Sequence, residues 1–368
     1  MRRSPVMRIE DLDTPFLAVD AGVLERNLTD GADRARRRGL AWRPHAKTHK
    51  CVAVARRQLA HGATGLTLAT VGEAEVFAAA GVDDLFLAYP VWAAGGRADR
   101  LRALAGRVRL RIGVDSAAGA DRLAAALRGA PAQVLIEIDS GHHRTGVAPG
   151  DAGGLAAGAQ AAGLEVAGVF TFPGHAYAPG ARATAAADEI AALSAAAAGL
   201  AAAGIEPLVR SGGSSPTENL SPELPDRWAP TETRPGVSVF GDAQQVELDA
   251  AGFDRCALTA VATVVHARPG HAVLDAGSKT LGADRAPWAS GHGRLPEHPG
   301  ARVTALSEHH ATVAFGDGDG PVPEPGSRVR VLPNHVCTAV NLADHLVVVD
   351  GGETVVDRWP VDARGANT

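Results

Sequence analysis

The sequence has few cysteines, few aromatic residues and little net charge. Three Cys in 368 residues cannot form the disulfide framework of a small secreted domain. The formal net charge of -5 is modest and acidic, so we expect neither a nucleic acid nor an anionic membrane as a partner. Aromatic residues make up only 4% of the chain. The bulk of the core must therefore come from Val, Leu and Ala.

Long hydrophobic runs are also missing. The first 16 residues contain basic side chains, but no apolar run of signal-peptide length follows them. The stretch from Ala191 to Gly204 is alanine-rich and lacks the large aliphatic residues of a membrane span, so a packed or solvent-facing helix explains it better. The 43 Gly and 23 Pro are scattered, which argues against collagen and against long disorder. We expect a soluble, globular, cytoplasmic protein.

Short apolar runs alternate with longer segments of helical composition over the first two thirds of the chain. This alternation favours a parallel sheet. Eight strands within about 200 residues fit a (β/α)₈ TIM-type barrel, and a doubly wound open sheet is the alternative. The predicted strands are Leu40 to Arg43, Gly65 to Ala69, Leu85 to Tyr89, Val108 to Val114, Gln133 to Asp139, Val166 to Phe172, Pro207 to Arg210 and Thr231 to Arg234.

After about Gly241 the sequence becomes β-rich, with Gly and Pro turns and no long helical pattern. Runs such as CALTAVATVVHA, SRVRVLP and HLVVVDGG have the composition of strands. We predict a barrel over residues 21–249 and a C-terminal β-domain over residues 250–368. Residues 1–20 include the apolar run Phe16 to Val19, which could add a strand to the β-domain.

A basic motif, Arg43-Pro-His-Ala-Lys47-Thr-His-Lys50, follows the first predicted strand. Barrel enzymes place their chemistry on loops at the carboxyl ends of the strands. Partial desolvation and cationic neighbours favour the neutral, nucleophilic form of a lysine in such a loop, which suits a Schiff base to pyridoxal phosphate. From composition alone, a basic surface loop explains this motif equally well.

Two glycine-containing turns follow the seventh and eighth predicted strands, where barrels often bind phosphate. Small residues let backbone N–H groups approach a phosphate closely, and hydroxyl groups add donors. Either turn alone is common. Together they predict a phosphate site that includes Ser211, Gly212, Gly213, Ser214 and Gly236.

The ordered set DTP, RPHAKTHK, SGGSSPT, RPG, LDAG and PNHVC, which runs from Asp11 through nearly the whole chain, resembles the D-threonine aldolase and D-serine dehydratase family. This family belongs to the alanine-racemase-like, fold-type III pyridoxal-phosphate enzymes. The resemblance implies that Lys47 carries the cofactor and that Arg144 lies near the cofactor ring. Tyr177 is a candidate cofactor contact and His175 a candidate acid/base, although a lone histidine in a loop is more often structural.

The motif Pro333-Asn-His335-Val-Cys337 is a candidate metal site. On an extended segment, residues two apart point to the same side, so His335 and Cys337 could bind one divalent ion. Two protein ligands leave positions open for water or substrate. The spacing alone is more often chance, but the family resemblance implies a metal at these two positions. A thiolate favours zinc, with manganese as the alternative.

The resemblance implies a lyase that acts on D-β-hydroxy-α-amino acids. The leading prediction is a D-threonine aldolase, which yields glycine and an aldehyde. The alternative is a D-serine dehydratase, which yields pyruvate and ammonia. Cys337 favours the alternative, because well-known aldolases of the family carry Asp at this position.

Two further functions are less favoured. An amino-acid racemase needs a second acid/base, usually a tyrosine of the β-domain, whereas the two Tyr of this chain lie in the predicted barrel. A non-catalytic pyridoxal-phosphate carrier would not need the additional β-domain. By resemblance we also expect a homodimer.

Overall fold

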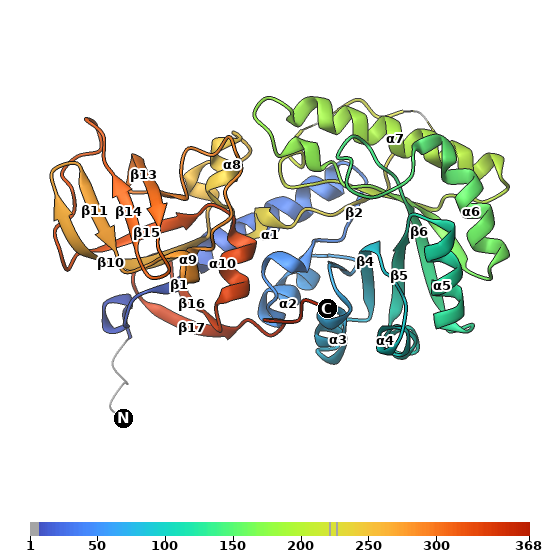
Figure 1. Cartoon of the computed structure of the whole chain (residues 1–368), viewed down its shortest axis with the longest axis horizontal. Helices are drawn as coiled ribbons and strands as arrows, with labels where there is room; N and C mark the ends of the chain where they lie inside the picture. The colour runs from blue at the N-terminus through green and yellow to red at the C-terminus, as the bar shows by residue number, and fades with distance from the viewer. Residues whose placement is uncertain (1–6, 221, 226) are drawn as a thin grey trace. The chain divides into compact units, whose positions relative to one another are not determined.

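The computed structural model describes residues 7–220, 222–225 and 227–368, which form two compact units (Figure 1). The barrel unit contains Gly31–Lys47, Val54–Gly236 and Gly365–Thr368. The β unit contains residues 7–30, Thr48–Ala53 and Val237–Arg364. Each unit thus gathers stretches that are distant in the sequence. The N-terminal segment belongs to the β unit, as the sequence analysis allowed, and residues 237–249 belong to the β unit and not to the barrel unit.

The barrel unit is built on an eight-stranded sheet in the order β2-β9-β8-β7-β6-β5-β4-β3. All neighbouring strands are parallel, and a parallel bridge between His45 and Thr67 joins the segment after β2 to β3. The sheet therefore curls back on itself, which confirms the predicted barrel over the open sheet. The strands are β2 (Ala41–Trp42), β3 (Leu66–Leu68), β4 (Asp84–Pro90), β5 (Arg109–Val114), β6 (Ala132–Glu137), β7 (Glu165–Phe170), β8 (Val209–Gly212) and β9 (Glu232–Thr233).

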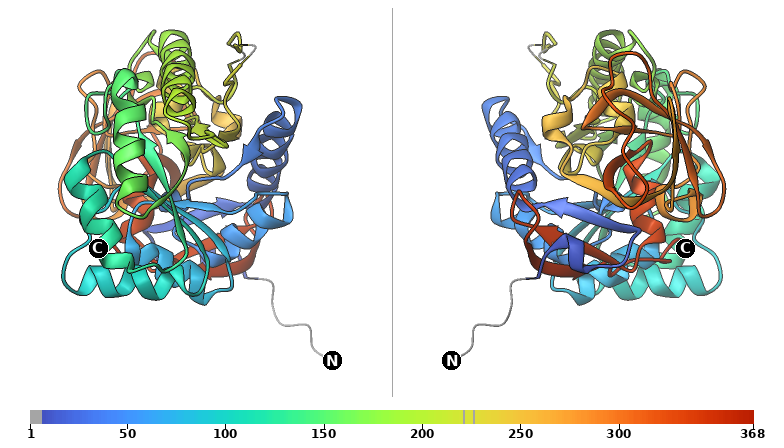
Figure 2. Two further views of the ribbon diagram at one scale, coloured as in Figure 1. Left: turned by 90° about the vertical axis from the view of Figure 1, so that its right-hand side faces the viewer. Right: turned by 90° about the vertical axis from the view of Figure 1, so that its left-hand side faces the viewer.

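Helices follow the strands and lie on the outside of the sheet (Figures 1 and 2). Local capping fixes where several of them begin: the Thr70 hydroxyl accepts the Glu73 N–H, and the Ser116 hydroxyl accepts the Gly119 N–H. The helices are α1 (Ala21–Arg37), α2 (Val52–Ala60), α3 (Val71–Ala79), α4 (Gly96–Ala105), α5 (Ala117–Leu127), α6 (Ala152–Ala161) and α7 (Arg182–Ala202), of which α1 and α2 are divided between the two units.

Helix α7 is long and apolar enough to cross a membrane by length and composition alone. Half of its most apolar window is buried in the protein, and the helix packs against α6, β7 and β8. Its alanine-rich sequence is therefore used as a packed helix of the barrel unit, as predicted.

The β unit contains a nine-stranded sheet in the order β11-β14-β13-β12-β15-β10-β1-β16-β17. Strand β1 (Phe16–Asp20) lies between β10 and β16, antiparallel to the first and parallel to the second. Strand β11 also pairs with β10, so part of the sheet closes into a ring. The other strands are β10 (Leu258–Arg268), β11 (His271–Leu274), β12 (Gly293–Leu295), β13 (His298–Leu306), β14 (Ala311–Ala314), β15 (Arg328–Pro333), β16 (His345–Val349) and β17 (Val355–Pro360).

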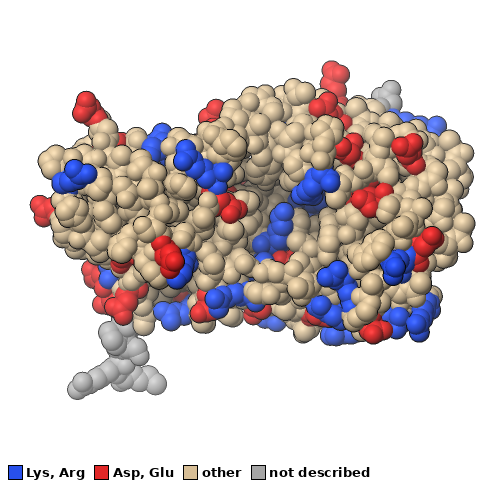
Figure 3. Space-filling view, viewed as in Figure 1, with Lys and Arg blue, Asp and Glu red and all other residues tan. Residues whose placement is uncertain are grey.

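Three short helices complete the described part of the β unit: α8 (Ala243–Glu247), α9 (Ser278–Leu281) and α10 (Val336–Leu342). They agree with the prediction that no long helix follows Gly241. On the face drawn in Figure 3, basic and acidic side chains are interspersed.

Candidate functional site

A cavity of ≈ 320 Å³ opens at the carboxyl ends of the strands of the barrel unit. This is where barrel enzymes place their active sites. The lining residues follow or end seven of the eight strands, so the closed sheet brings together side chains that lie far apart in the sequence. They are His45, Lys47, Ala69, Ala88, Tyr89, Pro90, Asp115, Arg144, Thr145, Phe172 and Arg234.

The ring of Phe172 lies close to three of the predicted cofactor residues. The Lys47 ammonium is 5.8 Å from the ring centroid, and the Arg144 guanidinium carbon is 5.3 Å from it. The Tyr177 ring centroid lies 6.1 Å away, at a tilted angle. We did not predict Phe172 as a site residue. Two features of the sequence could have indicated Phe172. It follows the sixth barrel strand, and phenylalanine is rare in this chain, which has only 8 Phe.

The loop that carries Arg144 is held by other residues. One oxygen of Asp139 accepts the N–H groups of Gly141 (2.9 Å) and His143 (3.0 Å), and the other lies 2.7 Å from the His143 ring. The Thr145 hydroxyl donates to the buried carboxylate of Glu137 at 2.8 Å, and burial raises the pKa of Glu137. These contacts fix the loop on both sides of Arg144.

His175 is tied to helix α7. Its Nε2 lies 3.2 Å from a carboxylate oxygen of Asp188, and its Nδ1 is buried without a hydrogen-bond partner in the described structure. Lys47 lines the cavity, whereas His175 does not. The structure therefore places one of the two predicted catalytic residues at the cavity and the other against helix α7.

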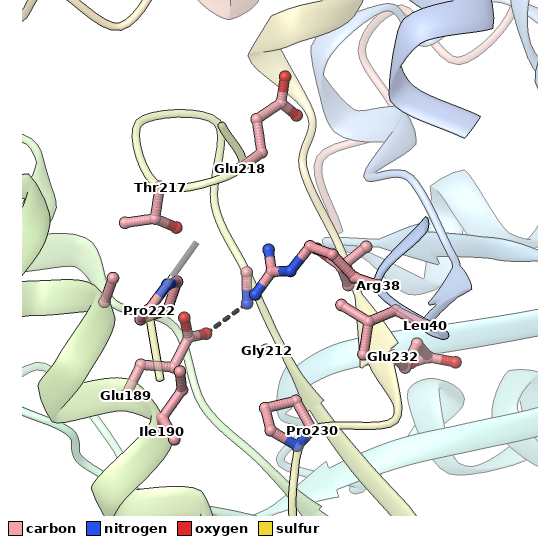
Figure 4. A pocket seen from close by; sticks show the side chains of 13 residues that line it. Arg38, Leu40, Glu189, Ile190, Gly212, Thr217, Glu218, Pro222, Pro230 and Glu232 are labelled. Carbon is pink, nitrogen blue, oxygen red and sulfur yellow. Dashed lines mark hydrogen bonds between the residues drawn. The ribbon is translucent and has the colours of Figure 1, made fainter. Parts of the chain in front are cut away.

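The first glycine turn begins later than predicted, because β8 extends through Gly212. The Ser211 hydroxyl lies inside the barrel, where it donates to Glu232 (2.7 Å) and accepts from Arg234 Nε (2.8 Å). The Gly213 N–H donates to the carboxylate of Glu189, as Figure 4 shows. These two predicted phosphate donors are thus already engaged within the fold.

The turn nevertheless requires glycine. Gly213 has a φ of +84°, and a Cβ atom there would lie 2.2 Å from the Thr233 hydroxyl oxygen. Further along, the Gly236 N–H donates to the Ser215 hydroxyl at 3.3 Å, while Ser214 is bonded to Thr217. The parallel pairing of β8 with β9 thus brings the two predicted turns side by side.

Arg234 is the buried cation of this region. Its guanidinium donates to the carbonyl of Thr171 and lies 5.5 Å from the ring centroid of Phe170 and 5.6 Å from that of Phe86. Burial lowers the pKa of the guanidinium. Arg234 ends the eighth predicted strand, and its side chain reaches the cavity.

In the β unit, the prediction that His335 and Cys337 lie on one extended segment is wrong. His335 is extended (φ -129°, ψ 106°) and caps helix α10, whereas Cys337 lies in the first turn of that helix. The helix begins here because the Val336 N–H is taken by the buried carboxylate of Asp242 at 3.2 Å. The two side chains still interact, and the Cys337 thiolate raises the pKa of His335 to about 9.

Two further groups surround this pair. The Cys337 sulfur lies 3.3 Å from the hydroxyl of Thr48, which follows Lys47 in the chain. A carboxylate oxygen of Asp284 lies 3.6 Å from His335 Nδ1. The described residues contain no group of three or more His, Cys, Asp and Glu arranged to hold a metal. The pair alone offers an imidazole and a thiolate, which is a donor set that suits zinc.

Comparison with known proteins identifies the fold family. Residues 19–244 match the model of the alanine racemase N-terminal domain, and residues 257–349 match that of a putative serine dehydratase domain. The chain belongs to the alanine-racemase-like family. The predicted family is confirmed, and with it the class of pyridoxal-phosphate-dependent lyases.

Relatives of this alanine-racemase-like protein carry functional names, of which two follow. The D-threo-3-hydroxyaspartate dehydratase of Delftia sp. (strain HT23) is 36% identical over 357 residues, which cover 89% of this chain and 91% of the relative. The D-threonine aldolase of Arthrobacter sp. is 33% identical over 375 residues, which cover 98% and 94%.

Solved structures agree with this family. The D-threonine aldolase from Filomicrobium marinum has a TM-score of 0.85 at 32% identity and covers 99% of each chain. A D-threo-3-hydroxyaspartate dehydratase has been solved as a histidine-to-alanine variant, with a TM-score of 0.88 at 32% identity and 96% of each chain covered. It has also been solved, in a metal-free form, as a variant whose cysteine two positions further on is replaced by alanine.

Proposed function

We propose that this protein is a pyridoxal-phosphate- and metal-dependent dehydratase that removes water from a D-β-hydroxy-α-amino acid. The observation that carries the proposal is the interacting pair His335 and Cys337 at the start of α10. The same two residue types, at the same spacing, were replaced in the solved D-threo-3-hydroxyaspartate dehydratase variants, and the cysteine variant is described as metal-free.

Lys47 is the residue that we propose to bind the cofactor. The chain has only three lysines, Lys47, Lys50 and Lys279, and Lys47 is the one that lines the cavity. A cavity of ≈ 320 Å³ falls within the range of about 300–1,000 Å³ typical of small-molecule sites. When bound, pyridoxal phosphate withdraws the electron pair that is left at the substrate α-carbon.

The surrounding residues orient the cofactor and the proton. Phe172 and Tyr177 supply aromatic surface beside Lys47, and Arg144 supplies positive charge. We propose that the Lys47 amine takes the α-proton once the substrate amine has displaced it. Ser214, Ser215 and Gly236 are the proposed phosphate contacts, because they lie on the two turns that the pairing of β8 with β9 brings side by side.

His335 and Cys337 are the residues that we propose to hold the divalent ion. A bound zinc ion acts as a Lewis acid and makes a hydroxyl a better leaving group. Manganese is the alternative, although the thiolate makes it less suited.

The position of His175 favours elimination over an aldol cleavage that uses this histidine as the base. Elimination needs a base for the α-proton, and a cavity lysine can serve. Aldol cleavage instead needs a base for the β-hydroxyl proton, and the candidates for that role are His175 and a metal-bound water. His175 is bound to Asp188 and does not line the cavity. Aldol cleavage stays the second candidate, because the Arthrobacter relative is a D-threonine aldolase.

Product analysis tests the proposal. Purified, cofactor-loaded protein is given D-serine, D-threonine or D-threo-3-hydroxyaspartate, with and without a chelator. A dehydratase releases ammonia with pyruvate, 2-oxobutanoate or oxaloacetate respectively, and the activity is lost on chelation and restored by Zn²⁺. Glycine and an aldehyde would instead identify an aldolase. Racemised substrate alone would contradict both. The homodimer and the cytoplasmic location stay predictions.

A further inference from the structure

The buried carboxylate of Asp242 connects two helix starts in the β unit. Its Oδ1 accepts the Gln245 N–H at 2.9 Å and caps helix α8. Its Oδ2 accepts the Val336 N–H at 3.2 Å. Val336 stands between His335 and Cys337. One side chain therefore holds the peptide that joins the two proposed metal ligands.

A second set of contacts holds the same segment. The Gln244 N–H donates to the Asn334 carbonyl at 3.2 Å, and the Asn334 side chain donates to the Asp284 carbonyl at 2.9 Å. The start of α8 is thus hydrogen-bonded to the backbone of both Asn334 and Val336, on either side of His335. Asn334 in turn connects the motif to the segment whose carboxylate lies beside His335.

The burial of Asp242 is costly for a group that serves only as a helix cap. Its side chain is 1% exposed. A buried carboxylate is unfavourable unless it is hydrogen-bonded and its charge is compensated. Burial raises the pKa of Asp242, and His335 and the N–H groups of Gln245 and Val336 oppose that shift. A Ser would cap α8 as well, so the second oxygen, which accepts the Val336 N–H, calls for another explanation.

We propose that Asp242 is the positioning residue of the metal pair, which it holds by fixing the Val336 amide. This inference rests on the proposed metal site. Residues that orient metal ligands from outside the coordination sphere commonly change metal affinity about 10- to 100-fold. Asp242 would act in this way through the backbone that joins the two ligands.

Two variants test the inference in the full, cofactor-loaded protein. Asp242→Asn keeps the cap at α8 but turns an acceptor into a donor that faces the Val336 N–H. Val336→Pro removes that N–H and leaves the Asp242 side chain in place. Proline is favoured at the first position of a helix, and the extended His335 is compatible with a following proline. Zn²⁺ affinity is measured by competition with a chromogenic chelator.

We expect each variant to bind Zn²⁺ about 10- to 100-fold more weakly than the wild type, with unchanged pyridoxal-phosphate content. Asp20→Asn is the matched control, because Asp20 accepts the Val23 N–H at the start of α1 in the same unit. It should keep wild-type affinity.

Wild-type Zn²⁺ affinity in a folded Asp242→Asn or Val336→Pro protein would overturn the role of Asp242 alone. A wild-type protein that binds no Zn²⁺ would instead overturn the metal site itself, and with it the proposed function. If Asp242→Asn does not fold, the proline variant still decides between these outcomes.

Discussion

At the scale of single residues, Glu189 carries a buried carboxylate that makes stability depend on pH. It lies on α7, is 7% exposed and accepts the Gly213 N–H. Burial raises its pKa to about 7 from an ordinary value of 4.5, although the Gly213 bond and the charges of Arg234 and Arg38 oppose the shift. Figure 4 shows Arg38 on the same small cavity as Glu189.

Glu189→Gln should abolish this pH dependence. Between pH 4.5 and about 7 the folded protein keeps a proton that the unfolded chain releases. Stability is therefore lost as the pH rises, by about 3 kcal/mol at most. Glutamine stays neutral, so its variant should lose less stability between pH 5 and pH 8. Urea unfolding at both pH values measures this. Equal losses in the two proteins would rule out Glu189 as the source.

Lys47 should be the residue that bears pyridoxal phosphate. Borohydride reduction converts the Schiff base into a stable amine, so peptide sequencing by mass spectrometry finds the labelled lysine. We expect the label on Lys47 in the wild type and none in Lys47→Ala. Lys279→Ala is the control, because its ammonium is exposed and paired with Glu308. A label on Lys50 would show that the wrong lysine of the motif was chosen.

At the scale of elements, helices α6 and α7 meet through a pair of glycines. A Cβ atom at Gly153 would lie 2.4 Å from the Gly199 carbonyl oxygen. The next residue, Gly154, has nothing within 4 Å of such an atom. The two helices can therefore approach closely at one glycine, while its neighbour faces open space.

These adjacent glycines form a matched pair of substitutions. Gly153→Ala should destabilise the protein by about 1–3 kcal/mol, because α6 and α7 must separate or shift to admit the methyl group. Gly154→Ala should stabilise it by up to about 1 kcal/mol, because alanine has the higher helix propensity. Denaturant unfolding compares the two. Similar changes in the free energy of unfolding at both positions would show that helix propensity, and not packing, determines the effect of these substitutions.

At the scale of the whole molecule, the β unit depends on the N-terminal segment. Strand β1 lies inside the nine-stranded sheet and pairs with β10 and β16, which are separated from it by more than two hundred residues. Without β1 the two neighbouring strands would each expose an unpaired edge. The C-terminal stretch alone is therefore not a complete folding unit.

A fragment experiment tests this dependence. Residues 237–364 expressed alone should show little ordered β-structure by circular dichroism. Residues 7–30 joined to that fragment by a flexible linker should restore a cooperative unfolding transition. A Val19→Asp change in the joined fragment should abolish it again, because Val19 is completely buried in β1. A folded fragment without residues 7–30 would contradict the role of β1.

The sequence by itself determined the eight barrel strands, the β-rich second part and the place of Lys47 on the loop after the first barrel strand. These features are local, because an apolar run and the helical segment after it are patterns of neighbouring residues. The ordered motifs were also sufficient to identify the family, because their order along nearly the whole chain leaves few alternatives.

Only the tertiary structure decided which side chains face the cavity and which are already bonded. His175 is bound by Asp188, the Ser211 hydroxyl by Glu232 and Arg234, and the Gly213 amide by Glu189. The helix start that replaced the predicted extended segment depends on Asp242, which lies 94 residues before Val336. Hydrogen bonds between such distant residues leave no periodic signal in the sequence, since they form only when the strands and helices that carry them have been packed together.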